Sequence, residues 1–476
     1  MTFSMLPILL LIGIPLAASV VTFLLDGRSR TARMILLLTA FLHMGITAYT
    51  FVCCPAGNEW LGLDALARII LAITSFLFLA VSVHTVFWLH ADKVYAHNHS
   101  HILIFNRSIF LPALLAFLGT MTLVISARNF GLLWVAVEAT TLVSAPLICY
   151  HLSDRSLEAM WKYLLICSVG IGLALFGTIT MAVAAHPAGI HGLNMDLMKN
   201  ASAQFHIGWF KAAFIFILAG YGTKMGLAPF HTWLPDAHSE APGSVSALLS
   251  GALLNCSFLG IIRVMDVAPA ELKTFCSDLL IALGLISLAT AAFFIIRQAD
   301  FKRMLAYSSV EHMGIAALLW GVGAADISVL HLCGHSLIKM SLFLLAGNLL
   351  LAYGTRSVAA VSGSFKTLPC TSALWLTGIL LICGTPPSPL FVTEFMLIKN
   401  MASSPILAAV VLILLFAVFA GMSKIALSMC MGVPAKVPED ERLNRTERLA
   451  MIPAAAIMLA IAFGTALTII LNWGFR

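Results

Sequence analysis

Lysine, histidine and glutamate side chains lie inside stretches of this sequence that are otherwise apolar enough to cross a membrane. Glu138 is near the middle of one stretch, Lys224 is near the end of another, and Glu394 follows a proline-rich break in a third. A charge at the centre of a bilayer costs at least about 2.5–3.5 kcal/mol on insertion scales, and such residues are usually functional. Side chains of these types bind and release protons, so we expect them to form a buried ion path.

A second set of titratable residues shares one helical stripe. His331, His335 and Lys339 stand at positions i, i+4 and i+8, a spacing that puts them on the same face of a helix. Histidine has an unperturbed pKa of about 6.5, which suits a proton relay. The alternative is that each histidine simply bonds to a neighbouring helix. No carboxylate or cysteine joins them at ligand spacing, so we predict no metal site here.

Two apolar stretches are broken by proline. Pro229 ends the stretch 209–227 and opens the polar run 231–240, and the segment 384–389 interrupts the stretch 369–398. Irregular backbone at membrane depth is tolerated only where protein or a water-filled cavity receives its polar groups. Interrupted helices in corresponding positions of two halves point to inverted repeats and their binding sites. We therefore expect the proton chemistry to gather near these breaks.

Structural interpretations remain open for the same residues. Glu138 and Lys224 form a candidate ion pair, which would equally serve to hold two helices together. Glu394 would equally serve as a cap for the helix that resumes after the break, because acidic side chains are favourable near a helix N-terminus. Three residues of the first polar run either line a proton entry from the cytoplasm or act as turn and cap residues: His231, Asp236 and His238. The histidines at 97, 99 and 101 fit a solvated loop better than a metal site.

Composition places the chain in a membrane. Of 476 residues, 61% are hydrophobic and 10% are charged, whereas soluble proteins carry roughly 25% charged residues. The net charge of +6 is spread over loops, so nucleic acid is not an expected partner. No nucleotide-binding glycine loop and no CxxC pair occurs, and the ten cysteines fit small buried hydrophobes. We predict no catalytic residue and no cofactor in this chain.

The hydropathy pattern predicts an all-α polytopic protein with about 14 transmembrane helices, since each span needs about 20 apolar residues. Alternate loops carry about 16 and about 7 basic residues, which puts the richer side in the cytoplasm and both termini outside. The expected spans are 4–24, 34–54, 62–90, 108–127, 130–151, 161–185, 208–228, 243–265, 277–298, 303–322, 326–352, 369–398, 404–431 and 447–472.

Four motifs resemble those of one known family. They run from Lys224 to His238, from Asp300 to Gly314, from His331 to Leu345 and from Pro386 to Phe395, and the likeness covers most of residues 105–430. The sequence is similar to the antiporter-like subunits of respiratory complex I, of Mrp-type Na⁺/H⁺ antiporters and of membrane-bound hydrogenases. Two segments most resemble the component F type subunit of group 4 hydrogenases, the hydrogenase-4 and formate hydrogenlyase relatives. They are Gly-Tyr-Gly-Thr-Lys-Met-Gly and Ser-Ser-Val-Glu-His-Met-Gly.

The resemblance implies two inverted five-helix repeats, each with a broken helix. The expected division is 1–105 for about three N-terminal helices, 106–265 for the first repeat with its break near 229–242, 266–431 for the second repeat with its break near 384–389, and 432–476 for a cytoplasmic loop and the last helix.

The family pattern also implies roles for particular residues. Glu138 takes the place of the glutamate paired with the lysine of the first broken helix, Lys224, and Glu394 takes the terminal position in the second. The central relay corresponds to His331, His335 and Lys339. This sequence departs from the pattern at Asn255, where many members have lysine or histidine. A proton must cross there by water ordered by Asn255 and Ser257, or the axis is interrupted.

We therefore expect a proton-translocating, non-catalytic subunit of a redox-driven complex, above all a group 4 membrane-bound hydrogenase. The alternatives are a subunit of a complex I-type NADH-quinone oxidoreductase, a Mrp-type Na⁺/H⁺ antiporter subunit that moves sodium, a non-conducting scaffold, and a membrane partner for uptake of inorganic carbon. The expected partners are other membrane subunits, a peripheral redox arm, protons and the lipid bilayer. The expected location is the bacterial inner membrane.

Overall fold

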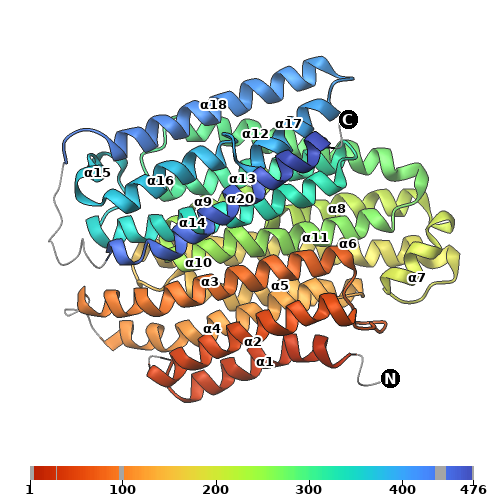
Figure 1. Ribbon diagram of the computed structural model, residues 1–476. Coiled ribbons are helices and arrows are strands. Elements are labelled where there is room, and N and C mark those ends of the chain that lie inside the picture. Colours follow the sequence, from red (N-terminus) through yellow and green to blue (C-terminus); the bar gives the residue numbers. More distant parts are fainter. Residues whose placement is uncertain (1–4, 28, 96–100, 435–445, 474–476) are drawn as a thin grey trace. The chain divides into compact units, whose positions relative to one another are not determined.

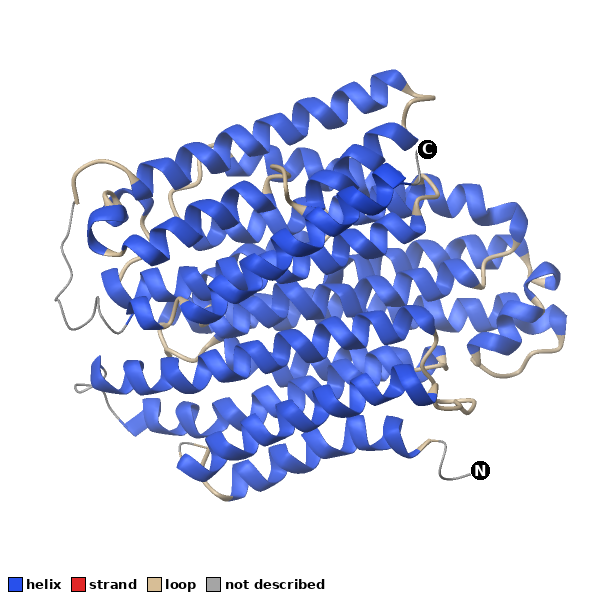
Figure 2. Cartoon of the chain, viewed as in Figure 1, coloured by secondary structure: helices blue, strands red, loops and turns tan. Residues whose placement is uncertain are grey.

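The computed structural model describes residues 5–27, 29–95, 101–434 and 446–473. Helices and the loops between them make up this part of the chain, and its strand-like pairing is confined to three isolated bridges (Figure 2). Twelve helices in the described ranges are long and apolar enough to cross a membrane. Two further predicted spans correspond to α13 (Phe301–Gly321), which carries Glu311 and His312, and to the broken pair α16 (Pro369–Ile382) and α17 (Pro389–Asn400). The predicted all-α polytopic fold is confirmed.

The chain divides into two compact units. The first contains residues 1–82, 98–226 and 252–278. Its helices, labelled in Figure 1, are α1 (Leu6–Leu24), α2 (Arg30–Cys53), the first part of α3 (Ala65–Tyr95), α4 (His101–Ser126), α5 (Phe130–Ile148), α6 (Asp154–Ala185), α7 (Met195–Asn200), α8 (Ile207–Met225) and α11 (Leu254–Asp266).

The second unit contains residues 83–97, 227–251 and 279–476. It holds the rest of α3 and the helices α9 (Trp233–Glu240), α10 (Gly243–Leu248), α13, α14 (Ala325–Tyr353), α15 (Ser364–Thr367), α16, α17, α18 (Pro405–Cys430) and α20 (Met451–Trp473), with most of α12 (Lys273–Ile295). A π-helical turn, Leu249–Leu253, follows α10.

Both predicted helix breaks are present. Helix α8 ends at Met225, followed by Gly226 with φ +82°, and α16 ends at Ile382, just before Gly384 with φ +67°. Only glycine adopts such positive φ values without a steric penalty. Hydroxyl groups bond to backbone groups near the breaks: Ser287 accepts from the Ala228 amide at 2.9 Å, and Ser388 donates to the Leu381 carbonyl at 2.6 Å. These bonds meet the requirement that backbone polar groups in a membrane interior find partners.

Close backbone approach joins α6 to α8 in the first unit. A Cβ atom at Gly177 would lie 2.6 Å from Ile217 Cγ1 and 2.9 Å from the Ala213 carbonyl oxygen. The same helix α6 carries Gly172, which faces outward and has no atom within 4 Å of its Cβ position. Small residues at such contacts let membrane helices pack tightly, and this packing fixes α8, which carries Lys224.

We predict that Gly177→Val destabilises the protein, because overpacking of a tight helix contact costs about 1–3 kcal/mol. Gly172→Val is the matched control on the same helix, with the same side chain added in open space. The measurement is the thermal unfolding midpoint of each purified variant in detergent. Equal midpoints for the two variants would contradict the tight packing of α6 against α8.

Candidate functional site

Lys224 lies in the last turn of α8 and is fully buried. Its ammonium Nζ donates to Thr141 Oγ1 at 2.9 Å and to the Tyr163 hydroxyl at 2.5 Å, and it lies 4.5 Å from the centroid of the Tyr163 ring. The Tyr163 hydroxyl is also 2.6 Å from Ser144 Oγ. Lys224 is thus held by a chain of buried hydroxyl groups.

Glu138 and Lys224, the candidate ion pair, bond to other side chains and not directly to each other among the described residues. Glu138 instead accepts a hydrogen bond from Ser168 Oγ at 2.9 Å, and its other carboxylate oxygen is buried without a hydrogen-bond partner in the same ranges. Thr141 lies three residues further along α5 and takes the Lys224 ammonium. The Glu138 charge still acts on Lys224 through space. Attraction therefore remains, but a hydroxyl group replaces the direct contact.

Asn255 and Ser257 are both fully buried on α11, directly after the π-helical turn. Ser257 Oγ donates to the Leu253 carbonyl at 3.3 Å. Single π-helical turns inside α-helices are frequent at functional sites. The role of these two residues in ordering water stays a prediction.

The second unit holds the predicted stripe on α14. His331, His335 and Lys339 are all fully buried. His331 Nδ1 lies 2.8 Å from Thr393 Oγ1 on α17, and its Nε2 lies 3.3 Å from His312 Nδ1 on α13. The spacing of the three residues therefore did predict a shared buried face, and helices α13 and α17 supply its partners.

His312 extends the stripe, although the sequence did not place it there. Its ring centroid is 5.3 Å from that of His331 and 5.3 Å from that of His335. Both ring nitrogens of His335 are buried with no hydrogen-bond partner in the described ranges. Three imidazoles thus lie together, and one of them lacks the protein hydrogen bonds that buried polar groups normally make.

Lys339 ends the stripe. Its ammonium donates to the Leu305 carbonyl and to Ser308 Oγ on α13, each at 2.6 Å. Glu311, nearly buried on the same helix, acts on Lys339 through space. The surroundings of Lys339 repeat those of Lys224, since neutral oxygen atoms hold the amine and a carboxyl group stands farther away.

Glu394 is half-buried on α17 and packs against the second break, because a Cβ atom at Gly384 would lie 2.2 Å from Glu394 Oε2. The cap of α17 is Ser388, whose side chain accepts from the Leu390 amide. Glu394 is therefore not needed as the cap of α17. Glu394 also lines an open cavity of about 460 Å³ whose other lining residues are Cys383, Phe391, Phe395, Ile398, Leu412, Leu415, Phe416 and Phe419. Its carboxyl group thus lies at the edge of the unit.

The three candidate entry residues contact different neighbours in the described part of the chain. Asp236 pairs with Arg303 at 3.1 Å, the His231 ring lies 6.1 Å from the Tyr307 ring, and the His238 ring stacks on Phe343 at 4.7 Å. Their role in proton entry stays a prediction. The histidines at 97 and 99 lie outside the described residues, as does the side chain of His101.

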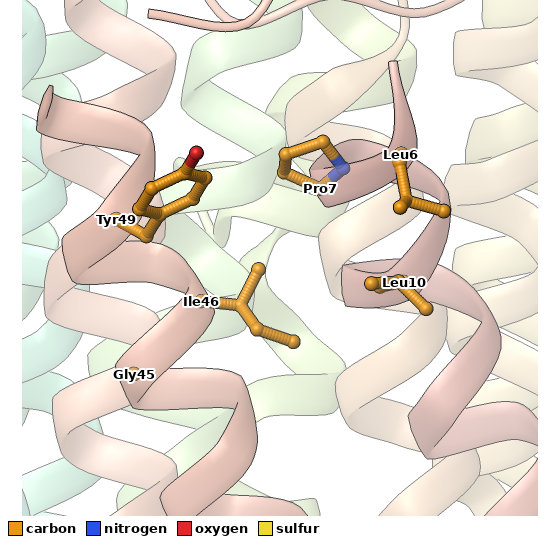
Figure 3. Close-up of a pocket in the computed structure, with 6 residues that line it drawn as sticks. All are labelled: Leu6, Pro7, Leu10, Gly45, Ile46 and Tyr49. Atoms are coloured by element: carbon orange, nitrogen blue, oxygen red, sulfur yellow. The ribbon is translucent and has the colours of Figure 1, made fainter. Parts of the chain in front are cut away.

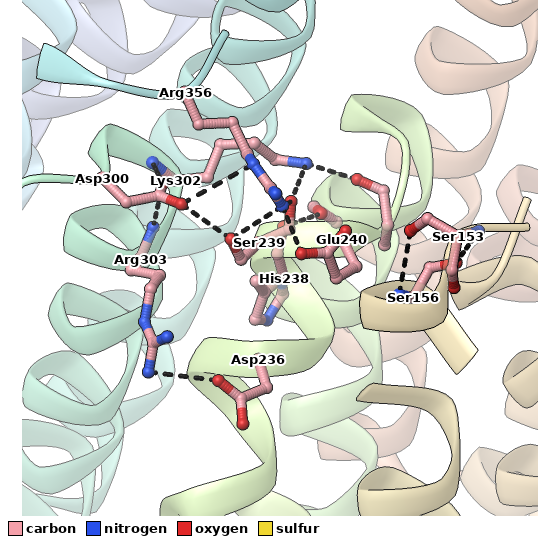
Figure 4. A network of polar contacts seen from close by, with 12 residues as sticks. Ser153, Ser156, Asp236, His238, Ser239, Glu240, Asp300, Lys302, Arg303 and Arg356 are labelled. Atoms are coloured by element: carbon pink, nitrogen blue, oxygen red, sulfur yellow. Dashed lines mark hydrogen bonds and ion pairs between the residues drawn. The ribbon is translucent and has the colours of Figure 1, made fainter. Parts of the chain in front are cut away.

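An ionic network fixes the end of α9 (Figure 4). Arg356 Nη1 binds Glu240 Oε1 at 2.6 Å and the Ser239 carbonyl at 2.8 Å, and Ser239 Oγ donates to Asp300 at 2.8 Å. Lys302 donates to the carbonyls of Ser239 and Ala241. Cations are favourable at a helix C-terminus, where carbonyl groups lack partners. Lys302 lies between the predicted spans 277–298 and 303–322, where a loop is expected, but it is fully buried.

A second cavity, of about 470 Å³, opens between α1 and α2 (Figure 3). It is lined by Leu6, Pro7, Leu10, Gly45, Ile46 and Tyr49. These side chains offer one phenol and otherwise apolar surface. None of the six is a lysine, a histidine or a carboxylic acid, so we assign this cavity no part in proton transfer.

We predict that Arg356→Met destabilises the protein by about 1–3 kcal/mol, because it removes charge-assisted bonds that are largely shielded from solvent. Lys162→Met is the control, since Lys162 and Glu158 form an exposed i,i+4 pair and such pairs contribute less than about 1 kcal/mol. The measurement is thermal unfolding together with hydrogen exchange of the α9 amides. Unchanged exchange in Arg356→Met would refute the anchoring role of this arginine.

Comparison with known proteins gives matches over most of the chain. The sequence profile of the family described as "NADH:quinone oxidoreductase/Mrp antiporter, TM" matches residues 127–423, more than half of the chain. The "Hydrogenase-4 component F homolog" of Methylacidiphilum infernorum is 38% identical over 304 residues, covering 62% of this chain and 63% of that protein. "Hydrogenase-4 component B" of Escherichia coli is 28% identical over 376 residues, covering 73% of this chain and 55% of that protein.

The matches therefore span less than two thirds of the length of these two relatives. A chain of the solved Mrp complex from Dietzia sp. DQ12-45-1b superposes with a TM-score of 0.84 at 18% identity, covering 99% of this chain and 96% of that one. At this identity the superposition shows a shared fold.

Proposed function

This chain belongs to the NADH:quinone oxidoreductase/Mrp antiporter transmembrane family, and we propose that it carries protons through a membrane as one subunit of a redox-driven complex. The observation that carries the proposal is the burial of Lys224 and Lys339 in neutral surroundings. A structural lysine in an apolar interior is normally paired with a carboxylate, because an unpaired buried charge is strongly destabilising. Both lysines instead contact neutral oxygen atoms.

Hydroxyl partners suit a lysine that changes its protonation state. A hydroxyl group has one donor and two acceptor positions and rotates to suit its neighbour. Thr141 and Tyr163 accept from the Lys224 ammonium in the structure, and either hydroxyl group has the proton needed to donate to the neutral amine. A carboxylate in direct contact would favour the charged form. These surroundings therefore lower the cost of losing and regaining a proton at Lys224.

Glu138 then acts as the electrostatic control of this step. An opposite charge nearby favours the charged form of a lysine, and its removal favours release of the proton. Changes in the position of the Glu138 carboxylate, bound to Ser168 in the structure, would alter the attraction on Lys224. In the first unit, water ordered near Asn255 and Ser257 would carry the proton away from Lys224. In the second unit, the relay through His335, His331, His312 and Lys339 would lead a proton toward Glu394.

The transported ion we propose is the proton. A hard cation such as sodium binds through several oxygen ligands, whereas the cavity at Glu394 offers a carboxyl group among mostly aromatic and aliphatic side chains. Protons need a single titratable group at each step. The alternative hypothesis is an Mrp-type Na⁺/H⁺ antiporter subunit, and sodium-dependent transport would favour it.

The driving complex we propose is a group 4 membrane-bound hydrogenase. The relatives from Methylacidiphilum infernorum and Escherichia coli both carry the name of a hydrogenase-4 component. The chain would hold no cofactor, and redox chemistry would occur in a peripheral arm on neighbouring subunits. By the distribution of basic loops, the complex would lie in a bacterial inner membrane with both termini of this chain on the periplasmic side. Purification of the intact complex tests this assignment: a nickel–iron subunit supports it, and NADH-oxidising and quinone-binding subunits indicate complex I instead.

We predict that Lys224→Met lowers redox-driven proton uptake into membrane vesicles by at least about 10²-fold, a typical effect of removing a proton-transfer group, while the complex still assembles. Methionine fills a similar volume and cannot titrate. Lys211→Met is the control, because Lys211 lies on the same helix but is exposed, 5.4 Å from the Phe275 ring. Proton uptake is followed with a pH-sensitive dye beside the redox rate. Full pumping by Lys224→Met would rule out the proposed function.

A further inference from the structure

Several buried polar atoms of the second unit have no hydrogen-bond partner in the described part of the chain, and most of them belong to residues near the segment 343–348 of α14. They are His84 Nδ1 and Thr85 Oγ1 on α3, Ser244 Oγ on α10, Asn348 Nδ2 on α14 and both ring nitrogens of His238 on α9. All five residues are at most 3% exposed. The sequence had assigned a role to His238 alone.

Three contacts place His84, Ser244 and His238 near the segment of α14 that contains Asn348. His84 Nε2 lies 3.3 Å from Asn348 Oδ1. Helices α10 and α14 meet where a Cβ atom on Gly243 would lie 2.6 Å from the Phe343 carbonyl oxygen and 3.0 Å from Gly347 Cα. This contact brings Ser244, which follows Gly243, to the segment of α14 that contains Asn348. The His238 ring stacks on Phe343 of the same segment at 4.7 Å.

Such a cluster calls for water. At least about 90% of buried polar groups in proteins are hydrogen-bonded, and each unsatisfied group costs about 1–3 kcal/mol. Buried water typically bonds to about three polar groups that would otherwise lack partners. Here the imidazoles of His84 and His238, the Ser244 hydroxyl group and the Asn348 amide offer both donors and acceptors. Water molecules in this cluster would satisfy all of them.

The cluster also leads to the relay. Phe343 contacts His238 on one side, and the Lys339 ammonium lies 5.8 Å from the centroid of the same ring. His238 and Lys339 are therefore both neighbours of one aromatic side chain. A proton held at His238 has Lys339 as the next basic group on α14.

We propose that His84, Asn348, Ser244 and His238 line a hydrated branch that supplies protons to Lys339, with His84 as its proton-carrying residue on α3. The proposal rests on the proposed function and adds a second route into the relay. His84 lies outside residues 127–423, which the family profile matches. In each step one proton passes from a hydronium ion to an imidazole nitrogen and then to the next water molecule, so no electrons are exchanged.

Asn348 suits this use of His84. Its amide offers an oxygen to a protonated Nε2 or, after a flip, an NH₂ group to an unprotonated one. The ring is thus held in either state, and Nδ1 is left to bond with water. His43, an equally buried histidine of α2, is the structural contrast: its two ring nitrogens lie 3.0 Å from Thr122 Oγ1 and 2.9 Å from Ser75 Oγ, and Ser75 bonds further to Thr47.

The test uses the intact complex in membrane vesicles. His84→Gln keeps hydrogen-bonding capacity but cannot titrate, so proton uptake is expected to fall by at least about tenfold, with an unchanged thermal midpoint. His43→Gln is the matched control and is expected to pump within about twofold of the wild type. Asn348→Leu, which removes the amide but keeps His84, is expected to reduce pumping as well and serves if His84→Gln fails to assemble.

The outcomes separate the branch from the proposed function. Normal pumping by His84→Gln and Asn348→Leu, in vesicles where Lys224→Met does not pump, overturns the branch and leaves the function standing. Normal pumping by Lys224→Met overturns the function itself. An experimental density map of the complex that resolves water tests independently whether the cluster is hydrated. Ordered water bonded to His84 Nδ1 and Ser244 Oγ is expected, and direct protein contacts at these atoms would overturn the hydrated cluster.

Discussion

An amine buried in an apolar interior must keep hydrogen-bond partners in each of its protonation states, and the arrangement of this protein follows from that constraint. Lys224 meets it with Thr141 and Tyr163, and Lys339 meets it with Ser308 and the Leu305 carbonyl. Neither lysine has a carboxylate in direct contact among the described residues, although Glu138 and Glu311 act on them through space. The acidic groups can therefore regulate the amines without fixing their charge.

The helix breaks serve the same need. A continuous transmembrane helix keeps its backbone groups bonded to one another, so it offers none of them to a passing ion. Breaks after α8 and α16 release such groups, and serine hydroxyls bond to them: Ser287 and Ser388 do so at the breaks, and Ser336 does so at the Gly251 carbonyl in the π-helical turn. Side-chain hydroxyl groups and backbone groups thus bond to one another in the interior at these breaks.

Sequence alone predicted the features that a single helix determines. The breaks followed from Pro229 and the 384–389 segment, and the buried face of α14 followed from the spacing of three residues. Features that depend on which helices meet were missed. Tyr163 and His312 gave no periodic signal, and Lys302 looked like a loop cation although it caps α9. The candidate ion pair of Glu138 and Lys224 gave no sign that Thr141 on α5 takes the Lys224 ammonium. The His84 contact joins residues 264 positions apart, a separation at which periodicity says nothing.

The anchoring of α9 has a mechanical consequence. Arg356 follows the last residue of α14, Tyr353, by three positions, and it grips the final turn of α9 through Glu240 and Ser239. Helix α14 bears His331 and His335 of the proposed relay, and α9 bears His238. Because Arg356 lies only three positions beyond the end of α14, its bonds hold the C-terminal ends of α14 and α9 together. We therefore expect a displacement of one helix end to be transmitted to the other.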